Sequence, residues 1–299
     1  MDEQIYTLDV SDLQSLNTQD GQTALAALES GQVIHFPSYF FSSGTLTDQH
    51  MLSESILDGK HKNVSFDYRT QRLGGYQQQA DKPDLANDLK LFMQAYAKFA
   101  KDTVDTLLPQ YKDSLQWGRT SYRPAQILGR ANSKRKDDTR LHVDAFSSTP
   151  VNGLRILRVF CNINPYGEPR VWHLGEPFSK VMQQFAPKIP AYNPVIARLL
   201  RLVKATKSLR SAYDHYQLQL HDRMKLDDNY QQTVTKNIMN FPAQSTWIVF
   251  TDHVSHAALS GQYLLEQTFY LPVTAMASPE LSPLKYWEQE DKLVSAQVL

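Results

Sequence analysis

The sequence RLHVDAF (residues 140–146) places a histidine and an aspartate two positions apart in an extended stretch. Side chains at positions i and i+2 of a β-strand project from the same face, so His142 and Asp144 present an imidazole beside a carboxylate. A histidine from another strand would complete a facial set of two histidines and one carboxylate. That set holds non-haem Fe(II) and leaves coordination positions open for O₂ and a bidentate co-substrate.

The third ligand is predicted in the downstream sequence WIVFTDHVSHAALSG (247–261), which a second strand, YLLEQTFYL (263–271), follows. His253 and His256 compete for this role, because residues three apart on an extended segment face opposite ways. We predict His256, since its distance from the strand end fits a resemblance of these strands to the closing strands of double-stranded β-helix (cupin-type) 2-oxoglutarate oxygenases. The remaining histidines lack ligand spacing and are expected at the surface or in ordinary hydrogen bonds: His35, His50, His61, His173, His215 and His221.

Helical and strand-like segments alternate along the chain. Apolar residues recur with helical spacing within residues 81–111, whereas residues 154–163, 245–251 and 263–273 have the composition of strands. We predict an α+β fold with flanking N-terminal helices and a helical insert between core strands, and the resemblance of the closing strands implies a double-stranded β-helix (cupin or jelly-roll) core. The expected division of a single oxygenase domain (1–299) is an entry strand and helices in 1–116, core strands in 117–177 and 241–275, and the insert in 178–240.

Composition excludes several other classes of protein. The chain has 31 Lys and Arg against 31 Asp and Glu, so it lacks the basic surplus of a nucleic-acid-binding protein. Its one cysteine, Cys161, has no partner for an intrachain disulfide. The motifs of P-loop nucleotide hydrolysis and of α/β-hydrolases are absent, as are a secretory leader and a run of about 18 apolar residues. We therefore expect a cytoplasmic enzyme.

A 2-oxoglutarate oxygenase also needs a cation for the distal carboxylate of its co-substrate, and the fork of arginine suits this best. In many such enzymes this arginine lies about ten residues after the distal histidine. Here that window holds Glu266 and Gln267 instead. The cation must therefore come from elsewhere in the core.

A second branch of oxygenases, which includes the Jumonji-type and asparaginyl hydroxylases, supplies the cation from the strand after the HxD motif. In this chain that strand reads RILRVFCNIN (155–164). We predict Arg158 as the residue that binds 2-oxoglutarate, with Arg155 on the opposite face as the alternative. Asn162 and Gln267 are predicted as supporting hydrogen-bond donors.

Two long segments, LHVDAFSSTPVNGLRILRVFCNINPYGEPRVWHLGEPF (141–178) and FPAQSTWIVFTDHVSHAALSGQYLLEQTFYL (241–271), resemble the Kdo 3-hydroxylase family. Weaker similarity covers most of the chain. The resemblance implies Fe(II) held by His142, Asp144 and His256, with 2-oxoglutarate and O₂ consumed and succinate and CO₂ released. It also implies hydroxylation at C3 of Kdo, the 3-deoxy-octulosonic acid sugar of bacterial lipopolysaccharide, on a Kdo-containing lipid A precursor.

Basic residues gather where such an anionic, lipid-linked substrate would meet the protein. Candidate substrate contacts near the core strands are Arg123, Arg130, Arg140 and Arg170. Residues 188–210 carry six basic residues and no acidic one. In one alternative, this segment binds anionic lipid on the inner face of the inner membrane. In the other, its basic face is solvated and its apolar side chains dock the segment against the rest of the protein. These apolar side chains are Leu199, Leu200, Leu202 and Val203.

Other functions can use the same ligands. The same oxygenase chemistry can act on a protein side chain or a free metabolite, because the three ligands do not select the substrate. They can also belong to a non-catalytic metal-binding or sugar-binding cupin module. A zinc hydrolase would need a general base, for which Glu266 is the candidate. Substrate-dependent succinate release separates these functions.

Overall fold

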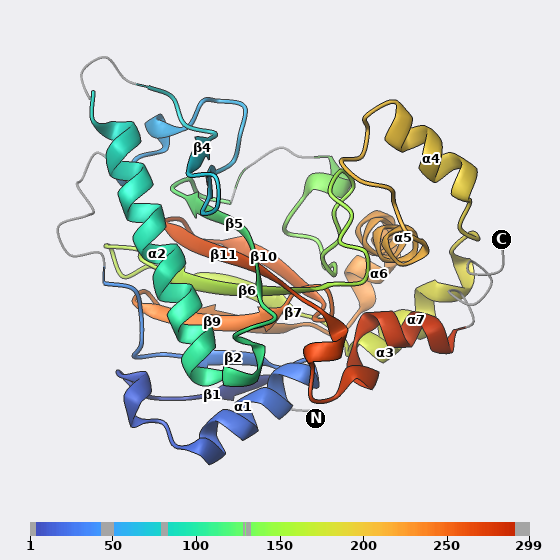
Figure 1. Ribbon diagram of the computed structural model, residues 1–299, viewed down its shortest axis with the longest axis horizontal. Coiled ribbons are helices and arrows are strands. Elements are labelled where there is room, and N and C mark those ends of the chain that lie inside the picture. Colours follow the sequence, from blue (N-terminus) through green and yellow to red (C-terminus); the bar gives the residue numbers. More distant parts are fainter. Residues whose placement is uncertain (1–3, 43–50, 79–82, 128, 130–132, 291–299) are drawn as a thin grey trace.

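Two β-sheets form the centre of the computed structural model, which describes residues 4–42, 51–78, 83–127, 129 and 133–290 (Figure 1). The large sheet contains β1 (Ile5–Thr7), β2 (Val33–Phe36), β3 (Val64–Asp67), β4 (Arg72–Gly74), β5 (Gln116–Arg123), β6 (Arg155–Asn162), β9 (Ser245–Phe250) and β11 (Leu264–Leu271). Its strand order is β1-β2-β9-β6-β11-β5-β3-β4. The small sheet has the order β10-β7-β8 and consists of β7 (Arg170–Leu174), β8 (Asn237–Phe241) and β10 (His256–Ser260).

Helices cover the outer face of the large sheet and gather beside one end of the small sheet. On the outer face lie α1 (Thr18–Glu29) and α2 (Leu85–Leu107) (Figure 1). A separate hydrophobic cluster joins α3 (Phe178–Phe185), α5 (Ala212–Leu226), α6 (Asp228–Thr233) and α7 (Pro283–Gln289), and α4 (Pro194–Leu202) lies at the periphery. None of the described helices has both the length and the apolar character that crossing a bilayer requires.

Local sequence explains where the outer helices begin and how they pack. Asn17 caps α1 through a reciprocal capping box with Asp20, in which each side chain accepts the backbone N–H of the other residue. Along α2, buried residues recur every three or four positions, which is the period of one helix face. Tyr96 on this face donates its hydroxyl to the carbonyl oxygen of Val159 in β6, 2.8 Å away. This bond ties α2 to a central strand.

An aromatic layer fills the space between the two sheets. Phe160 of β6 stacks on Trp247 of β9, and Trp172 of β7 packs edge-on against both rings. Trp172 also stacks on the imidazole of His256, with 5.1 Å between ring centroids. The packing of the two sheets therefore helps to position one of the predicted ligands.

The architecture is mixed α+β with a large sheet, as predicted, and the expected elements in residues 81–111 and 154–163 are α2 and β6. The expected strand at 140–146 is wrong, because within this segment only His142 forms a β-bridge, to His256. Asp144 instead donates its backbone N–H to the carbonyl oxygen of Thr251, just after β9, at 2.7 Å. The segment thus passes from the small sheet to the large sheet after a single bridge.

Candidate functional site

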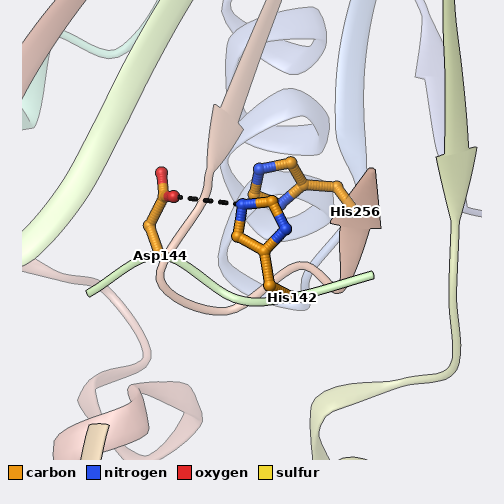
Figure 2. Close-up of side chains that lie close together, drawn as sticks. All are labelled: His142, Asp144 and His256. Carbon is orange, nitrogen blue, oxygen red and sulfur yellow. Dashed lines mark ion pairs between the residues drawn. The ribbon is translucent and has the colours of Figure 1, made fainter. Parts of the chain in front are cut away.

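His142 and His256 face each other across an isolated antiparallel bridge. The backbone N–H of His142 donates to the carbonyl oxygen of His256 at 3.0 Å, and the reciprocal bond measures 2.9 Å. The ring centroids are 4.7 Å apart. Two positions after His142, the Asp144 carboxylate points into the same space (Figure 2). Three side chains from two segments that are far apart in the sequence therefore meet at one point.

The donor atoms of these three residues fit a single divalent metal ion. One ligand atom from each residue lies within 4.8 Å of the others. Nδ1 of His142 is 2.8 Å from the carbonyl oxygen of Arg140, and Nδ1 of His256 is 2.8 Å from that of Val254. Because a carbonyl oxygen can only accept, each Nδ1 carries the proton and each Nε2 keeps its lone pair for a metal. The backbone thus presets both imidazoles as ligands.

The electrostatics of the site keep these groups in the form that binds a cation. Burial lowers the pKa of His142 well below its usual value and also lowers the pKa of His256, so both imidazoles are neutral near pH 7. Burial alone would raise the pKa of Asp144. The guanidinium of Arg158, 3.0 Å away, opposes burial most strongly, and the pKa of Asp144 lies below its usual range.

A cavity of about 320 Å³ opens beside the three ligands. Its wall includes Phe160 and Trp172 from the aromatic layer. Seven basic side chains line it, against three acidic ones. The basic residues are Lys62, Arg123, Arg135, Lys136, Arg158, Arg170 and Lys225, and the acidic residues are Asp138, Asp144 and Glu266. A concave site with this excess of positive charge favours small anionic molecules.

Arg158 and Glu266 form an ion-pair network in the cavity wall. Nη1 of Arg158 lies 2.7 Å from Glu266, and Arg123 donates to the other carboxylate oxygen of Glu266 at 3.0 Å. The Nε atoms of both arginines are buried and have no acceptor among the described residues, while the two side chains line the cavity. Two guanidinium groups occupy the Glu266 carboxylate, which argues against its use as the general base of a hydrolase.

Arg155, the alternative residue for binding 2-oxoglutarate, is completely buried on the opposite face of β6. Its Nε lies 2.8 Å from Asp252, and its guanidinium lies 3.8 Å from the ring centroid of Phe250. This side chain belongs to the core. Of the two arginines on β6, Arg158 is the one that reaches the cavity.

The structure corrects the prediction that Asn162 and Gln267 support the co-substrate, because neither side chain lines the cavity. Asn162, at the far end of β6, donates to the carbonyl oxygens of Glu168 and Phe241 at 3.0 and 3.2 Å. Gln267 accepts a hydrogen bond from Thr120 at 2.6 Å and neighbours Glu266 on β11, so its side chain projects from the other face of the sheet. Both amides satisfy polar groups within the sheets.

Of the four predicted substrate contacts, Arg123 and Arg170 line the cavity. Arg140 does not, because its guanidinium is held in an ion pair with Asp228 at 2.6 Å, outside the cavity. Arg130 lies outside the described residues. The structure therefore retains two of these four candidates at the site.

Helix α5 supplies cavity residues that the sequence analysis missed. His221, which lacked any predicted role, has its ring centroid 5.3 Å from that of His142, and Lys225 lies one helical turn further on. Their spacing of four residues shows that they share a helix face. That spacing does not reveal which part of the fold this face covers. His253, the rejected ligand candidate, packs against Phe178 with 5.0 Å between ring centroids and lies outside the cavity.

Comparisons with known proteins identify the family. The model of the 3-deoxy-D-manno-oct-2-ulosonic acid (Kdo) hydroxylase family matches residues 12–292. A crystal structure of the Kdo hydroxylase KdoO, a non-haem Fe(II) α-ketoglutarate-dependent dioxygenase, in complex with cobalt(II) is 44% identical, with a TM-score of 0.92 over 99% of both chains. KdoO structures with α-ketoglutarate and Fe(III), and with succinate and Fe(III), are each 43% identical over 99% of both chains, with TM-scores of 0.92 and 0.91. A search of curated proteins finds no match. The chain belongs to the Kdo hydroxylase family.

Proposed function

We propose that this protein is an Fe(II)- and 2-oxoglutarate-dependent dioxygenase that hydroxylates C3 of Kdo on a lipid A precursor and releases succinate and CO₂. The observation that carries the proposal is the group of His142, Asp144 and His256, with both Nε2 atoms available, in a strongly basic cavity. Kdo is a carboxylated sugar, and 2-oxoglutarate is a dicarboxylate. A cavity with surplus positive charge suits both molecules.

The two facing sheets support the assignment of the core as a double-stranded β-helix. The strand that carries His256 pairs with the HxD segment at one end of this core, as the closing strands of such a barrel do. The proposed division is a single oxygenase domain with N-terminal helices, core strands and an insert that holds α3 to α6. Because α5 lines the cavity, the insert is part of the active site in this proposal.

Bound Fe(II) would supply the oxidising chemistry with O₂ and 2-oxoglutarate, and the chain contributes binding and orientation. His142, Asp144 and His256 would hold the metal on one side and leave the cavity side open. The carbonyl oxygens behind each Nδ1 fix the orientation of the imidazoles. Phe160 and Trp172 form an apolar part of the cavity wall.

Arg158 is the residue that we assign to the distal carboxylate of 2-oxoglutarate. It lies beside Asp144, so an acid chelated at the metal would extend toward its guanidinium. The side chains of Arg158 and Arg123 both line the cavity. A bound carboxylate would accept charge-assisted hydrogen bonds from their guanidinium groups.

Replacing Arg158 by alanine is expected to raise the KM for 2-oxoglutarate by about 10- to 100-fold, because a hydrogen bond to a charged group contributes roughly 1.5–3 kcal/mol. The KM is measured from succinate formation at saturating sugar substrate. Arg158→Lys keeps the charge but loses the fork, so its KM should fall between those of wild type and Arg158→Ala. An unchanged KM in Arg158→Ala would remove Arg158 from this role.

Succinate release in the presence of different substrates tests the proposed function. The purified protein with Fe(II), 2-oxoglutarate and O₂ is assayed with a Kdo-bearing lipid A precursor, a peptide mixture and no substrate. We expect stimulation by the Kdo lipid alone, together with a product that is one oxygen atom heavier by mass spectrometry. Stimulation by peptides alone would support the alternative of a protein hydroxylase. No stimulation by any substrate would favour a binding module.

The surface of α4 supports the proposal that the enzyme works in the cytoplasm, peripherally attached to the inner face of the inner membrane. Of the two alternatives for this segment, the structure contradicts docking through its leucines, because Leu199 and Leu202 are 56% and 78% exposed. An exposed apolar stripe runs along the helix at helical spacing: Val195, Ile196, Leu199, Leu202 and Val203. Basic residues lie in or just after the helix: Arg198, Arg201, Lys204 and Lys207. This combination fits an anionic bilayer surface.

The segment that follows α4 reaches the neighbourhood of the metal cavity. Lys207 lines a second cavity of about 560 Å³, whose wall shares Arg123, Arg158 and Glu266 with the metal cavity. In this proposal, Lys207 connects the basic segment after α4 with the wall of the site.

Liposome flotation tests this attachment. Wild type is expected to float with vesicles that contain anionic phosphatidylglycerol and to be released by high salt, because each basic residue near the surface contributes about 1 kcal/mol. The double variant Leu199→Glu, Leu202→Glu should lose most of this binding. Ile238→Glu, at an equally exposed apolar residue on β8, is the matched control and should float like wild type. Equal flotation of all three proteins would contradict the proposal.

A further inference from the structure

The lining of the cavity carries more positive charge than the binding of the metal and the co-substrate neutralises. Seven basic side chains face three acidic ones in its lining, while a divalent cation and a dicarboxylate cancel each other's charge. The surplus therefore remains when both are bound. It is available to a further anionic group, which in the proposed function belongs to the sugar substrate.

Most of these cations already have a carboxylate partner in the fold. Arg158 and Arg123 bind Glu266, and Lys62 lies 3.2 Å from Asp138. Arg135 lies 3.1 Å from the carboxylate of Asp222. These close pairings already neutralise part of the charge of the four side chains, whereas a cation with a long ion pair keeps more of its charge for a second anion.

Lys225 differs from these cations because it is 2% exposed and its ion pair, with Asp138, is long at 4.0 Å. Asp138 is paired more closely with Lys62, at 3.2 Å, and Lys225 donates a hydrogen bond to the carbonyl oxygen of Arg135 at 3.3 Å. An ammonium group has three donors, and burying it without a close anion is unfavourable. Burial accordingly lowers the pKa of Lys225. A bound anion in the cavity would offset this cost.

The helix that carries Lys225 lies against the metal ligands. His221, one turn earlier on α5, has its ring centroid 5.3 Å from that of His142, and both α5 residues line the cavity. The arginines assigned to the co-substrate come instead from strands β5 and β6 of the large sheet. The cavity thus has one cationic wall made by strands and another made by α5.

In the proposed reaction, the carboxylate of the sugar lies close to the carbon that is hydroxylated. In a 3-deoxy-2-ulosonic acid, the carboxylate carbon is C1 and the carbon that lacks a hydroxyl is C3, two bonds away. If C3 is presented to the metal, the carboxylate must lie in the same cavity. We propose that Lys225 binds the C1 carboxylate of the sugar and so positions C3 for hydroxylation. This inference rests on the proposed function.

Calorimetry measures this contact without turnover. Protein loaded with Co(II) and 2-oxoglutarate under anaerobic conditions is titrated with the methyl glycoside of Kdo and with its C1 carboxamide. We expect wild type to bind the acid about 30-fold more tightly than the amide, which corresponds to about 2 kcal/mol. Lys225→Met should bind the acid about 30-fold more weakly than wild type does. Lys101→Met, on α2 and paired with Asp105, is the matched control and should bind the acid like wild type.

Kinetics separate this contact from a general disturbance of the site. In Lys225→Met the KM for the Kdo lipid should rise while the KM for 2-oxoglutarate stays within about twofold of wild type. Equal binding of the acid and the amide by wild type would overturn the inference. This comparison uses the wild-type protein alone, so it does not depend on the folding of a variant. If wild type releases succinate with the Kdo lipid but does not discriminate acid from amide, only the role of Lys225 fails. If wild type shows no Kdo-dependent succinate release, the proposed function fails.

Discussion

We expect His142→Ala to abolish both metal binding and turnover. Removing one of three protein ligands leaves a site that holds Fe(II) weakly, so turnover should fall roughly 1,000-fold or more, equivalent to about 4 kcal/mol of lost transition-state stabilisation. The direct measurement is an anaerobic titration with Fe(II) and 2-oxoglutarate, followed through the visible charge-transfer band of the chelate. Wild type should show this band, and the variant should lack it.

His173→Ala is the matched control for this experiment. His173 follows Trp172 on β7 and therefore projects from the opposite face of the small sheet, away from the cavity. The control should keep the band and the activity. A band of normal intensity in His142→Ala would show that the metal is held elsewhere. Circular dichroism of each variant distinguishes loss of the site from loss of the fold.

Arg155→Met is expected to destabilise the protein by about 3–5 kcal/mol, because it leaves Asp252 as an uncompensated buried carboxylate. Arg155 and Asp252 are both completely buried, and Nε lies 2.8 Å from the carboxylate. The loss also removes the contact of the guanidinium with the ring of Phe250. The melting temperature should fall by roughly 6–15 °C for a chain of this size.

Differential scanning calorimetry with two further variants tests the cause of this loss. The double variant Arg155→Met, Asp252→Asn should recover part of the stability, because it no longer buries a charge. Arg119→Met removes an exposed arginine whose pair with Asp67 spans 3.6 Å, and it should change stability by less than about 1 kcal/mol. A melting temperature in Arg155→Met equal to that of wild type would show that this ion pair is not needed for stability.

The three predicted ligands were accessible to sequence reasoning because their arrangement follows from local geometry. An i, i+2 pair on an extended segment shares a face in any fold, which brought His142 and Asp144 together. The resemblance to a known family then selected His256 over His253. The same alternation separated Arg155 from Arg158, but it did not say which face of β6 was turned toward the ligands.

Non-local packing decided the remaining features. Asn162 and Gln267 are polar residues on core strands, and only the register of neighbouring strands shows that their amides are used within the sheets. His221 and Lys225 share a helix face by their spacing, yet the cavity they cover is created by strands distant in the sequence. Likewise, the apolar stripe of α4 has the same sequence pattern whether it is docked or exposed.

The sequence by itself therefore determined the metal-ligand candidates, the α+β class and the family, because strand alternation, residue chemistry and motif similarity are properties of short segments. Only the tertiary structure decided which arginine of β6 enters the cavity, that α5 forms one of its walls, and that α4 presents leucines to solvent. These features depend on which surfaces pack together, and packing is a free-energy balance over the whole chain that no short segment specifies.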